Sequence, residues 1–211
     1  MTDHAPTTRG ILAVCTANVC RSPLAELHLR EALSAGPFHD VVVTSAGTRG
    51  VAGAAMCSTA RRVLDDPEHG AGHVAREVTR ELVEEADLVI AMEREHRGAL
   101  ARLAPGHQGK LFTLREAVPI LEAIAREGEL PGTVPELVER MRLLRGIVRP
   151  PEPEPAPRRR FALLRRPVPE SQDDGLSVED GHNIDHEAHE RTVATVRELT
   201  GRIGVALRGR A

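Results

Sequence analysis

Residues 10–30, GILAVCTANVCRSPLAELHLR, decide how this chain folds. The apolar run at 10–14 predicts a buried strand, because it is short and ends at small and polar residues. The run from Leu24 onward predicts a helix, with Ser22 as its N-cap and Pro23 at its first position. A strand, a tight loop and a helix in this order place the loop beyond the carboxyl end of the strand, where parallel sheets bind ligands.

The loop between this strand and this helix has the composition of an anion site with a nucleophile at its base. The first N–H groups of a helix lack internal partners and carry the positive end of its dipole, so they attract an oxyanion. Arg21 adds a planar guanidinium that can grip two phosphate oxygens. The same positive field, with a hydrogen bond from Ser22, favours the thiolate form of Cys15. The expected phosphate-binding residues are Thr16, Ala17, Asn18, Val19, Cys20, Arg21 and Ser22.

Strand-like and helix-like segments alternate along the chain. The expected strands are 10–15, 40–45, 86–92 and 109–113, and the expected helices are 22–35, 57–66, 78–85, 94–104 and a closing helix at 186–207. This alternation predicts an α/β fold in three layers, a four-stranded parallel sheet with helices on both faces.

Prolines divide the second half of the chain. Residues 115–148 are helical in character but interrupted, first at Pro119, which predicts two or three short helices. Residues 149–170 are rich in proline and arginine and predict a disordered linker. We therefore expect one catalytic domain from 9–118 and 171–207, an insertion at 119–170 and a flexible tail at 1–8. The basic stretch 158–166 is either a solvated loop or a weak binding site for an acidic partner.

Composition excludes several classes of protein. A net charge of −3 gives no bulk attraction to nucleic acid, and 41% hydrophobic residues suffice for a sizeable core. Three cysteines do not suggest a disulfide scaffold, and a thiolate nucleophile suits a reducing cytoplasm. We expect neither a signal peptide nor a membrane span, because no long apolar run is present.

Four further segments extend the pattern of the loop. They are 43–48 (VTSAGT), 73–78 (HVAREV), 86–93 (ADLVIAME) and 110–114 (KLFTL). With the loop, they resemble the low-molecular-weight protein-tyrosine phosphatase family over most of 9–118, and more loosely from 171. The resemblance implies the phosphotyrosine protein phosphatase I-like fold. It also implies a cytoplasmic enzyme that hydrolyses phosphotyrosine in proteins through a phosphocysteine, with Cys15 and Arg21 as catalytic residues and with no cofactor and no metal.

The resemblance also assigns supporting residues. Asn18, Ser22, Ser45 and His73 would form the hydrogen-bond network that holds the loop open. Ala17 stands where glycine is common, which would strain the loop if this position needs a positive φ, whereas Asn18 tolerates such geometry. Val19 is apolar and branched, as in the tyrosine phosphatases, while threonine at this place accompanies the arginine phosphatases.

The general acid comes from a late loop in the family, and alignment on the start of the last helix places Asp180 there. Gly181 replaces the usual proline, which predicts a more flexible loop, and His182 replaces an aromatic residue that walls the phosphotyrosine slot. The alternative carboxylates are Asp173, Asp174 and Asp185.

The remaining cysteines and histidines leave alternatives open. Cys20 is either a reversible disulfide partner of Cys15 or a small buried residue of the loop, and Cys57 is expected to pack within a helix. A histidine and carboxylate pattern near the closing helix is a weak metal signature, and we expect no metal there. Its members are His182, Asp185, His186, His189 and Glu190.

Two other functions share these features. An arsenate reductase would use the same loop, but thiol-coupled forms need further cysteines near the third strand, and this chain has none after Cys57. A non-catalytic phosphate-binding scaffold would explain Gly181 and His182, although the intact Cys15 and Arg21 favour an enzyme.

Overall fold

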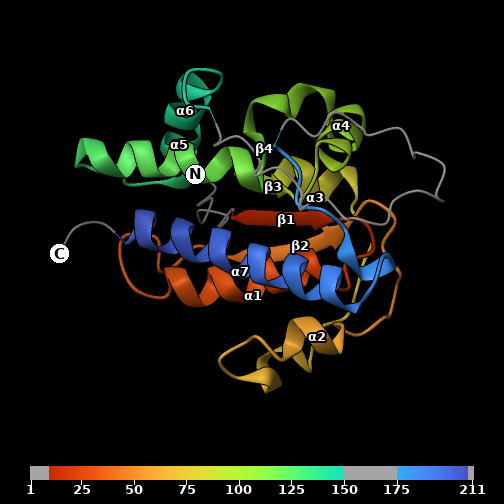
Figure 1. Ribbon diagram of the computed structural model, residues 1–211. Helices are drawn as coiled ribbons and strands as arrows, with labels where there is room; N and C mark the ends of the chain where they lie inside the picture. The colour runs from red at the N-terminus through yellow and green to blue at the C-terminus, as the bar shows by residue number, and fades with distance from the viewer. Residues whose placement is uncertain (1–9, 150–174, 209–211) are drawn as a thin grey trace, which may run out of the picture.

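The computed structural model describes residues 10–149 and 175–208. Its centre is a parallel four-stranded sheet in the order β2-β1-β3-β4, with helices on both faces (Figure 1). The strands are β1 (Ile11–Cys15), β2 (Val43–Gly47), β3 (Leu88–Ala91) and β4 (Leu111–Thr113). The predicted three-layer α/β class is therefore confirmed.

The second strand lies later in the chain than its composition suggests. It was expected at 40–45 but occupies Val43–Gly47, with Val43 opposite Ile11 and Gly47 opposite Cys15. A turn precedes it, in which the N–H of Val41 donates to the carbonyl of Phe38 over 3.1 Å. Val41 and Val42, which suggested an earlier strand, thus lie at the turn or directly after it. Pairing with β1 sets the start of β2 at Val43.

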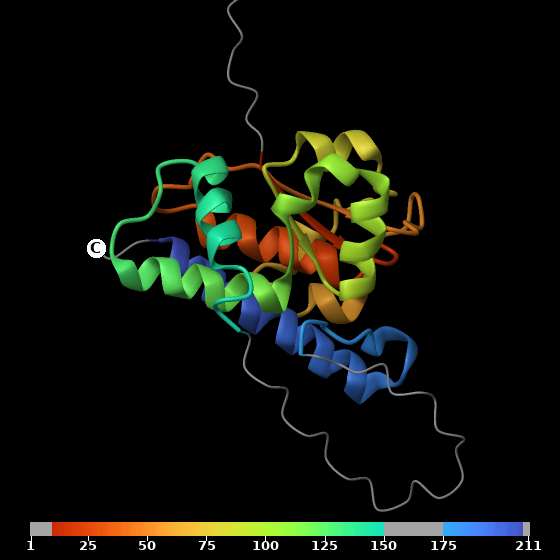
Figure 2. The ribbon, with the colours of Figure 1, turned by 90° about the horizontal axis from the view of Figure 1, so that it is seen from above.

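Successive side chains of each strand point to opposite faces of the sheet and contribute to two separate hydrophobic cores. On one face, Ile11, Ala13 and Ile90 pack beneath α1 (Arg21–Leu33), α5 (Leu114–Glu127) and α7 (His186–Leu207). On the other face, Leu12, Val14 and Val89 pack beneath α3 (Arg80–Glu85) and α4 (Arg94–Leu103). Figures 1 and 2 show α7 running alongside α1 on its side of the sheet. The carboxyl ends of β1 and β3 lie side by side at one edge of the sheet, where the N–H of Val178 donates to the carbonyl of Met92 over 2.8 Å.

Short elements complete the described chain. They are α2 (Ser58–Arg61), α6 (Val134–Leu144) and the 3₁₀ turns η1 (Pro67–Gly70), η2 (Pro105–Lys110) and η3 (Gly181–Asn183). The helix expected at 57–66 is thus reduced to the four residues of α2. Helix α1 also differs, because it begins at Arg21 and Cys20 is its N-cap. Ser22 is not a cap, since its hydroxyl faces the sulfur of Cys15 instead.

Helix α5 passes through Pro119 without a break. A capping box between Thr113 and Glu116 fixes its start, and Ile120, Leu121 and Ile124 are buried in the core under α7. Burial of this apolar face outweighs the one backbone hydrogen bond that proline cannot donate. The domain boundary expected after residue 118 falls inside α5. The rest of that division stays a prediction, and most of the linker, including 158–166, lies outside the described residues.

Helix α7 spans the bounds expected from the sequence. Gly204 faces α1, where an added Cβ would lie 2.4 Å from the Cβ of Ala32. Glycine therefore permits a close approach of the two helices. Among residues 10–149 and 175–208, no helix has the length and apolar character needed to cross a bilayer.

Candidate functional site

Cys15 ends β1 and lies at the base of the loop. Its side chain is buried, and its Sγ lies 3.0 Å from the Oγ of Ser22, on the first turn of α1. The Ser22 hydroxyl also lies 3.3 Å from the carbonyl of Ala46, on β2. A hydroxyl at this place can donate to the sulfur, which is the contact that the sequence predicts.

Asn18 anchors the loop from below. It is completely buried and, among the described non-glycine residues, it alone has a positive φ, 58°. Its Nδ2 donates to the Oγ of Ser22 over 2.9 Å and to the Oγ of Ser45 over 2.8 Å. Its Oδ1 accepts from the N–H of Arg76 over 3.0 Å. The predicted strain at Ala17 is therefore absent, because the left-handed residue is Asn18.

His73 supports the same part of the loop. Its Nε2 lies 2.7 Å from the backbone carbonyl of Asn18. Neighbouring loop carbonyls are also engaged, since Thr48 donates to Cys15 over 2.9 Å and the N–H of Cys57 donates to Val19 over 2.8 Å. The surrounding chain thus holds the loop by its carbonyl oxygens, and the sequence-predicted network is brought together.

Arg21 lies between two carboxylates. Its side chain is only 2% exposed, its Nη2 is 3.0 Å from Oδ2 of Asp180, and its Nη1 forms a short ion pair with Glu93. Nη1 also donates to the carbonyl of Val178 over 2.9 Å, and Nη2 to the hydroxyl of Thr16 over 3.4 Å. This arrangement fixes the plane of the guanidinium at the mouth of the loop.

Asp180 is the late-loop carboxylate that faces the loop. It N-caps η3, accepting from the N–H of His182 over 3.2 Å, and its side chain is 30% exposed. Asp185 has a different task, because it N-caps α7 by accepting from Ala188 over 2.8 Å. Asp173 and Asp174 lie outside the described residues. The site therefore contains the carboxylate that the sequence favoured.

Gly181 packs closely against α7, so the structure gives this glycine a steric reason in addition to the flexibility expected from the sequence. It is buried, and its N–H donates to the hydroxyl of Thr192 over 3.0 Å. An added Cβ would lie 2.1 Å from the carbonyl oxygen of Ala188. Glycine is required here because α7 passes so close, and proline would also remove the donor.

Sequence reasoning gave no role to Glu93 or His96. Glu93 follows β3 and pairs with Arg21, while the Nε2 of His96, on α4, lies 2.9 Å from the hydroxyl of Thr16. Burial, and then the positive charge of Arg21, lower the pKa of His96 to about 4. The sequence does offer one indication of their place. Both residues follow β3, which pairs with β1, and parallel strands end at the same edge of the sheet.

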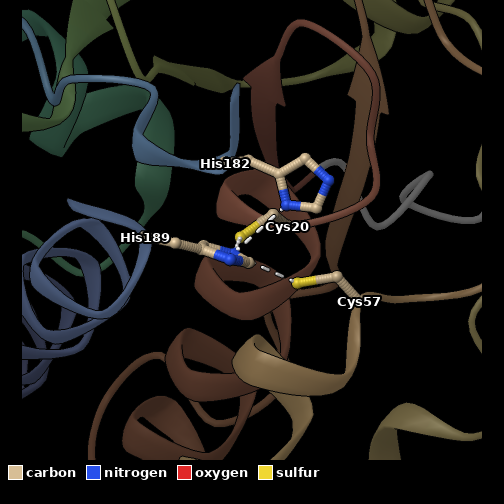
Figure 3. Close-up of side chains that lie close together, drawn as sticks. All are labelled: Cys20, Cys57, His182 and His189. Atoms are coloured by element: carbon tan, nitrogen blue, oxygen red, sulfur yellow. Dashed lines mark hydrogen bonds between the residues drawn. The ribbon is translucent and has the colours of Figure 1, made fainter. Parts of the chain in front are cut away.

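Cys20 and Cys57 face each other beside the loop, together with His182 and His189 (Figure 3). Cys57 N-caps α2 rather than packing inside a helix, and a hydrogen bond with the Cys20 thiol lowers the pKa of Cys57. The same hydrogen bond raises the pKa of Cys20. All three cysteines are free.

The histidine and carboxylate pattern near α7 comes together only in part. His182 and His189 lie together, but His186 pairs with Glu190 on the exposed side of the helix over 3.1 Å. Asp185 serves as the cap of α7. The partners of the two histidines are therefore cysteines distant in sequence.

Comparison with known proteins agrees with this geometry. Residues 10–127 match the family model described as low molecular weight phosphotyrosine protein phosphatase. The low molecular weight protein-tyrosine-phosphatase Etp of Escherichia coli K12 is 40% identical over 104 residues, 48% of this chain and 66% of Etp. The protein-arginine-phosphatase of Bacillus subtilis 168 is 36% identical over 108 residues, 51% of this chain and 71% of the relative. The chain thus spans about two thirds of the length of the relatives it matches.

Solved structures extend the likeness to the fold as a whole. The tyrosine phosphatase Wzb from Escherichia coli K30, in complex with phosphate, matches with a TM-score of 0.58 at 20% identity. The match covers 95% of this chain and 99% of Wzb. The family match spans more than half of the 211 residues, with the loop, Arg21 and the sheet all inside it. The chain therefore belongs to the low molecular weight phosphotyrosine protein phosphatase family.

Proposed function

We propose that this protein hydrolyses phosphotyrosine in proteins through a phosphocysteine intermediate. The observation that carries the proposal is the contact of Arg21 with Asp180, 3.0 Å between Nη2 and Oδ2, above a loop in which Ser22 lies 3.0 Å from the Cys15 sulfur. A nucleophile, an anion-binding cation and a proton donor are thus gathered in one place.

In the first step, the Cys15 sulfur attacks phosphorus in line with the bond to the phenolic oxygen. Arg21 and the loop N–H groups hold the other phosphate oxygens and neutralise their charge. The phosphorus–oxygen bond breaks, and protonated Asp180 transfers its proton to the leaving oxygen. The products are a tyrosine side chain and a phosphocysteine at residue 15.

In the second step, water attacks the phosphocysteine. Asp180, now a carboxylate, accepts a proton from that water while the sulfur–phosphorus bond breaks. Inorganic phosphate leaves, Cys15 returns as a thiolate, and Ser22 stabilises it by a hydrogen bond. Asp180 alternates between its two protonation states, so no further group is needed to move the proton.

Val19 supports tyrosine as the phosphorylated residue. Its branched apolar side chain is half-buried at the loop and offers a surface to a phenol ring. Phe38 and Phe112 are buried in the core, so among the described residues no phenylalanine walls the slot. His182 is exposed and lies two residues after Asp180, and it is the nearest residue in sequence to the proposed acid that carries a ring. A dianionic phosphate, rather than an aromatic clamp, would therefore carry most of the binding.

Cellular setting and partners form part of the proposal. A cytoplasmic location follows from the need of Cys15 for a reducing compartment. The substrates are phosphotyrosine-containing proteins, and the basic stretch 158–166 is either a solvated loop or a weak binding site for an acidic partner.

Hydrolysis of an aryl phosphate tests the reaction. We expect wild-type turnover, near-complete loss for Cys15→Ser and partial loss for Asp180→Ala. Asp40→Ala is the matched control, since its side chain is 86% exposed and paired only with His39 among described residues. Trapping of a phosphorylated residue 15 by rapid acid quench, in wild type and not in Cys15→Ser, would identify the intermediate.

The alternatives give different results in the same assay. Turnover that survives Cys15→Ser would exclude the phosphocysteine route. Binding of phosphate without any turnover would support a scaffold, and thiol-dependent reduction of arsenate would support a reductase.

A further inference from the structure

Four side chains of metal-binding type meet beside the Cys15 loop. Cys20, Cys57, His182 and His189 each offer one ligand atom, and these atoms all lie within 4.8 Å of one another. They come from the start of α1, the cap of α2, η3 and the first turn of α7 (Figure 3). Neither step of the proposed reaction uses their sulfur or ring nitrogen atoms.

The separations suit a single tetrahedral ion. Nε2 of His189 lies 3.1 Å from the Cys20 sulfur, 3.5 Å from the Cys57 sulfur and 3.3 Å from Nδ1 of His182. Zinc bonds of ~2.1 Å to nitrogen and ~2.3 Å to sulfur, at tetrahedral angles, place two nitrogens about 3.4 Å apart and nitrogen and sulfur about 3.6 Å apart. The three separations from His189 therefore match three of the six edges of the required tetrahedron, and the other three edges are no longer than 4.8 Å.

Hydrogen bonds alone do not account for this crowding. The Nε2 atom of His189 carries either one hydrogen or one lone pair, yet three polar atoms surround it within 3.5 Å. One hydrogen bond satisfies one of these neighbours and leaves the other two directed at the same nitrogen. A cation at the centre would accept a lone pair from all four side chains at once.

Charge and access also favour an ion. Two thiolates and two neutral imidazoles balance a divalent cation, so the filled site would be neutral, as its buried members Cys20 and His189 require. The Cys57 sulfur also accepts the N–H of Ala60 over 3.4 Å, a contact that supports a thiolate ligand. Exposed His182 provides the entry path for the ion.

We propose that Cys20, Cys57, His182 and His189 bind one zinc ion in a closed tetrahedral site. The site is structural, because four protein ligands leave no open position for substrate or water. It would join the loop that carries the nucleophile to the loop that carries Asp180, since Cys20 precedes Arg21 and His182 follows Asp180 by two residues. The ion binds whether or not the protein is a phosphatase.

Cobalt substitution tests the site without any need for turnover. The full chain with Cys15→Ser removes the proposed nucleophile, which would otherwise compete for metal. After reduction and removal of metal, Co²⁺ should bind with a stoichiometry of one ion per chain. We expect the intense visible bands of tetrahedral cobalt together with a sulfur-to-cobalt charge-transfer band, and their loss when Zn²⁺ is added.

Matched variants locate the ligands. In the same background, Cys57→Ser and His189→Gln should each abolish the charge-transfer spectrum or weaken cobalt affinity at least about tenfold. His186→Gln is the control, because His186 lies on the same helix but is exposed and points to Glu190. It should bind cobalt as the parent does.

Thermal unfolding provides a second measurement. Stoichiometric Zn²⁺ should raise the Tm of the Cys15→Ser protein by several degrees and leave that of Cys15→Ser/Cys57→Ser unchanged. The proposal is overturned if cobalt binds only in octahedral form, if its spectrum survives both ligand substitutions, or if Cys20 and Cys57 form a disulfide that persists under the reducing conditions of metal loading. None of these outcomes bears on hydrolysis by Cys15, so the two proposals fail separately.

Discussion

Arg21 and Asp180 form an ion pair across the mouth of the site, 3.0 Å between Nη2 and Oδ2. The group proposed to bind phosphate therefore also holds the group proposed to donate the proton. In the proposed reaction, a bound phosphate would compete with this carboxylate for the guanidinium. This competition makes the reaction sensitive to the chemistry of residue 180.

Asp180→Asn should slow hydrolysis according to the leaving group. General acid catalysis contributes a factor of about 100 to 10,000, and the loss should be large for phenyl phosphate, whose leaving oxygen needs a proton. It should be much smaller for p-nitrophenyl phosphate, whose phenolate leaves readily. Rates over a series of aryl phosphates measure the effect, and an equal loss for all of them would show that Asp180 is not the acid.

Gly181→Pro should destabilise the protein and reduce its activity. The ring would meet the carbonyl of Ala188, and the hydrogen bond to Thr192 would lose its donor, at a cost of at least about 2 kcal/mol in the free energy of unfolding. Urea unfolding measures this loss. Gly106→Ala is the control, since an added Cβ there meets nothing within 4 Å. A Gly181→Pro protein as stable as wild type would contradict the fit described for glycine.

Asn18 should stabilise the protein both through its side-chain hydrogen bonds and through its tolerance of a positive φ. Asn18→Gly keeps the left-handed geometry but removes three hydrogen bonds in a buried place, and we expect it to cost about 3 kcal/mol. Asn18→Ala should cost about 1 kcal/mol more, because strain at a φ of 58° exceeds the entropy cost of glycine. Denaturant unfolding of the pair separates the two contributions, and a reversed order would refute the role of the backbone.

His96 should make stability depend on pH. Its pKa of about 4 in the folded protein lies below the unfolded value of 6.5, so the unfolded chain binds more protons between these limits. Stability from this group is complete above pH 6.5 and falls by up to about 3 kcal/mol as the pH drops to 4. Unfolding of His96→Gln across this range should show a flatter profile, whereas exposed His39→Gln should follow wild type. Parallel profiles for all three would exclude His96.

Val19→Thr should shift the choice of phosphorylated residue. Loss of the apolar branch removes contact with a phenol ring, and the hydroxyl offers a hydrogen bond to a polar guanidinium instead. The ratio of kcat/KM for phosphotyrosine peptide to that for phosphoarginine peptide should fall at least about tenfold. Val51→Thr is the control, because Val51 is exposed and its N–H donates to the loop carbonyl of Ala17, but it lies outside the phosphate-binding set. An unchanged ratio would remove Val19 from substrate selection.

Local patterns were enough to predict the frame of the molecule. The apolar run of β1, the cysteine at its end and Arg21 lie within a single stretch of sequence, so one short segment defines both strand and loop. The bounds of α7 also followed from its apolar spacing. Asp180 was placed by counting back from that helix, and the structure sets it beside Arg21.

Contacts between distant segments account for what the sequence did not give. Glu93 reaches Arg21 only because β3 pairs with β1, and Cys57 meets His189 only because α2 packs near α7. The close packing of Gly181 has the same origin, since the nearby carbonyl of Ala188 belongs to a helix that begins later in the chain. Such neighbours depend on tertiary packing and leave no periodic pattern.

The tight seam between Gly204 and Ala32 has a mechanical consequence. Helices α1 and α7 both start at the site, one directly behind Cys20 and the other shortly after His182, and they touch again near their far ends. The spacing of the two helices therefore depends on the small side chains at this contact. A bulkier side chain at position 204 would therefore push apart the two helices that carry the ends of both site loops.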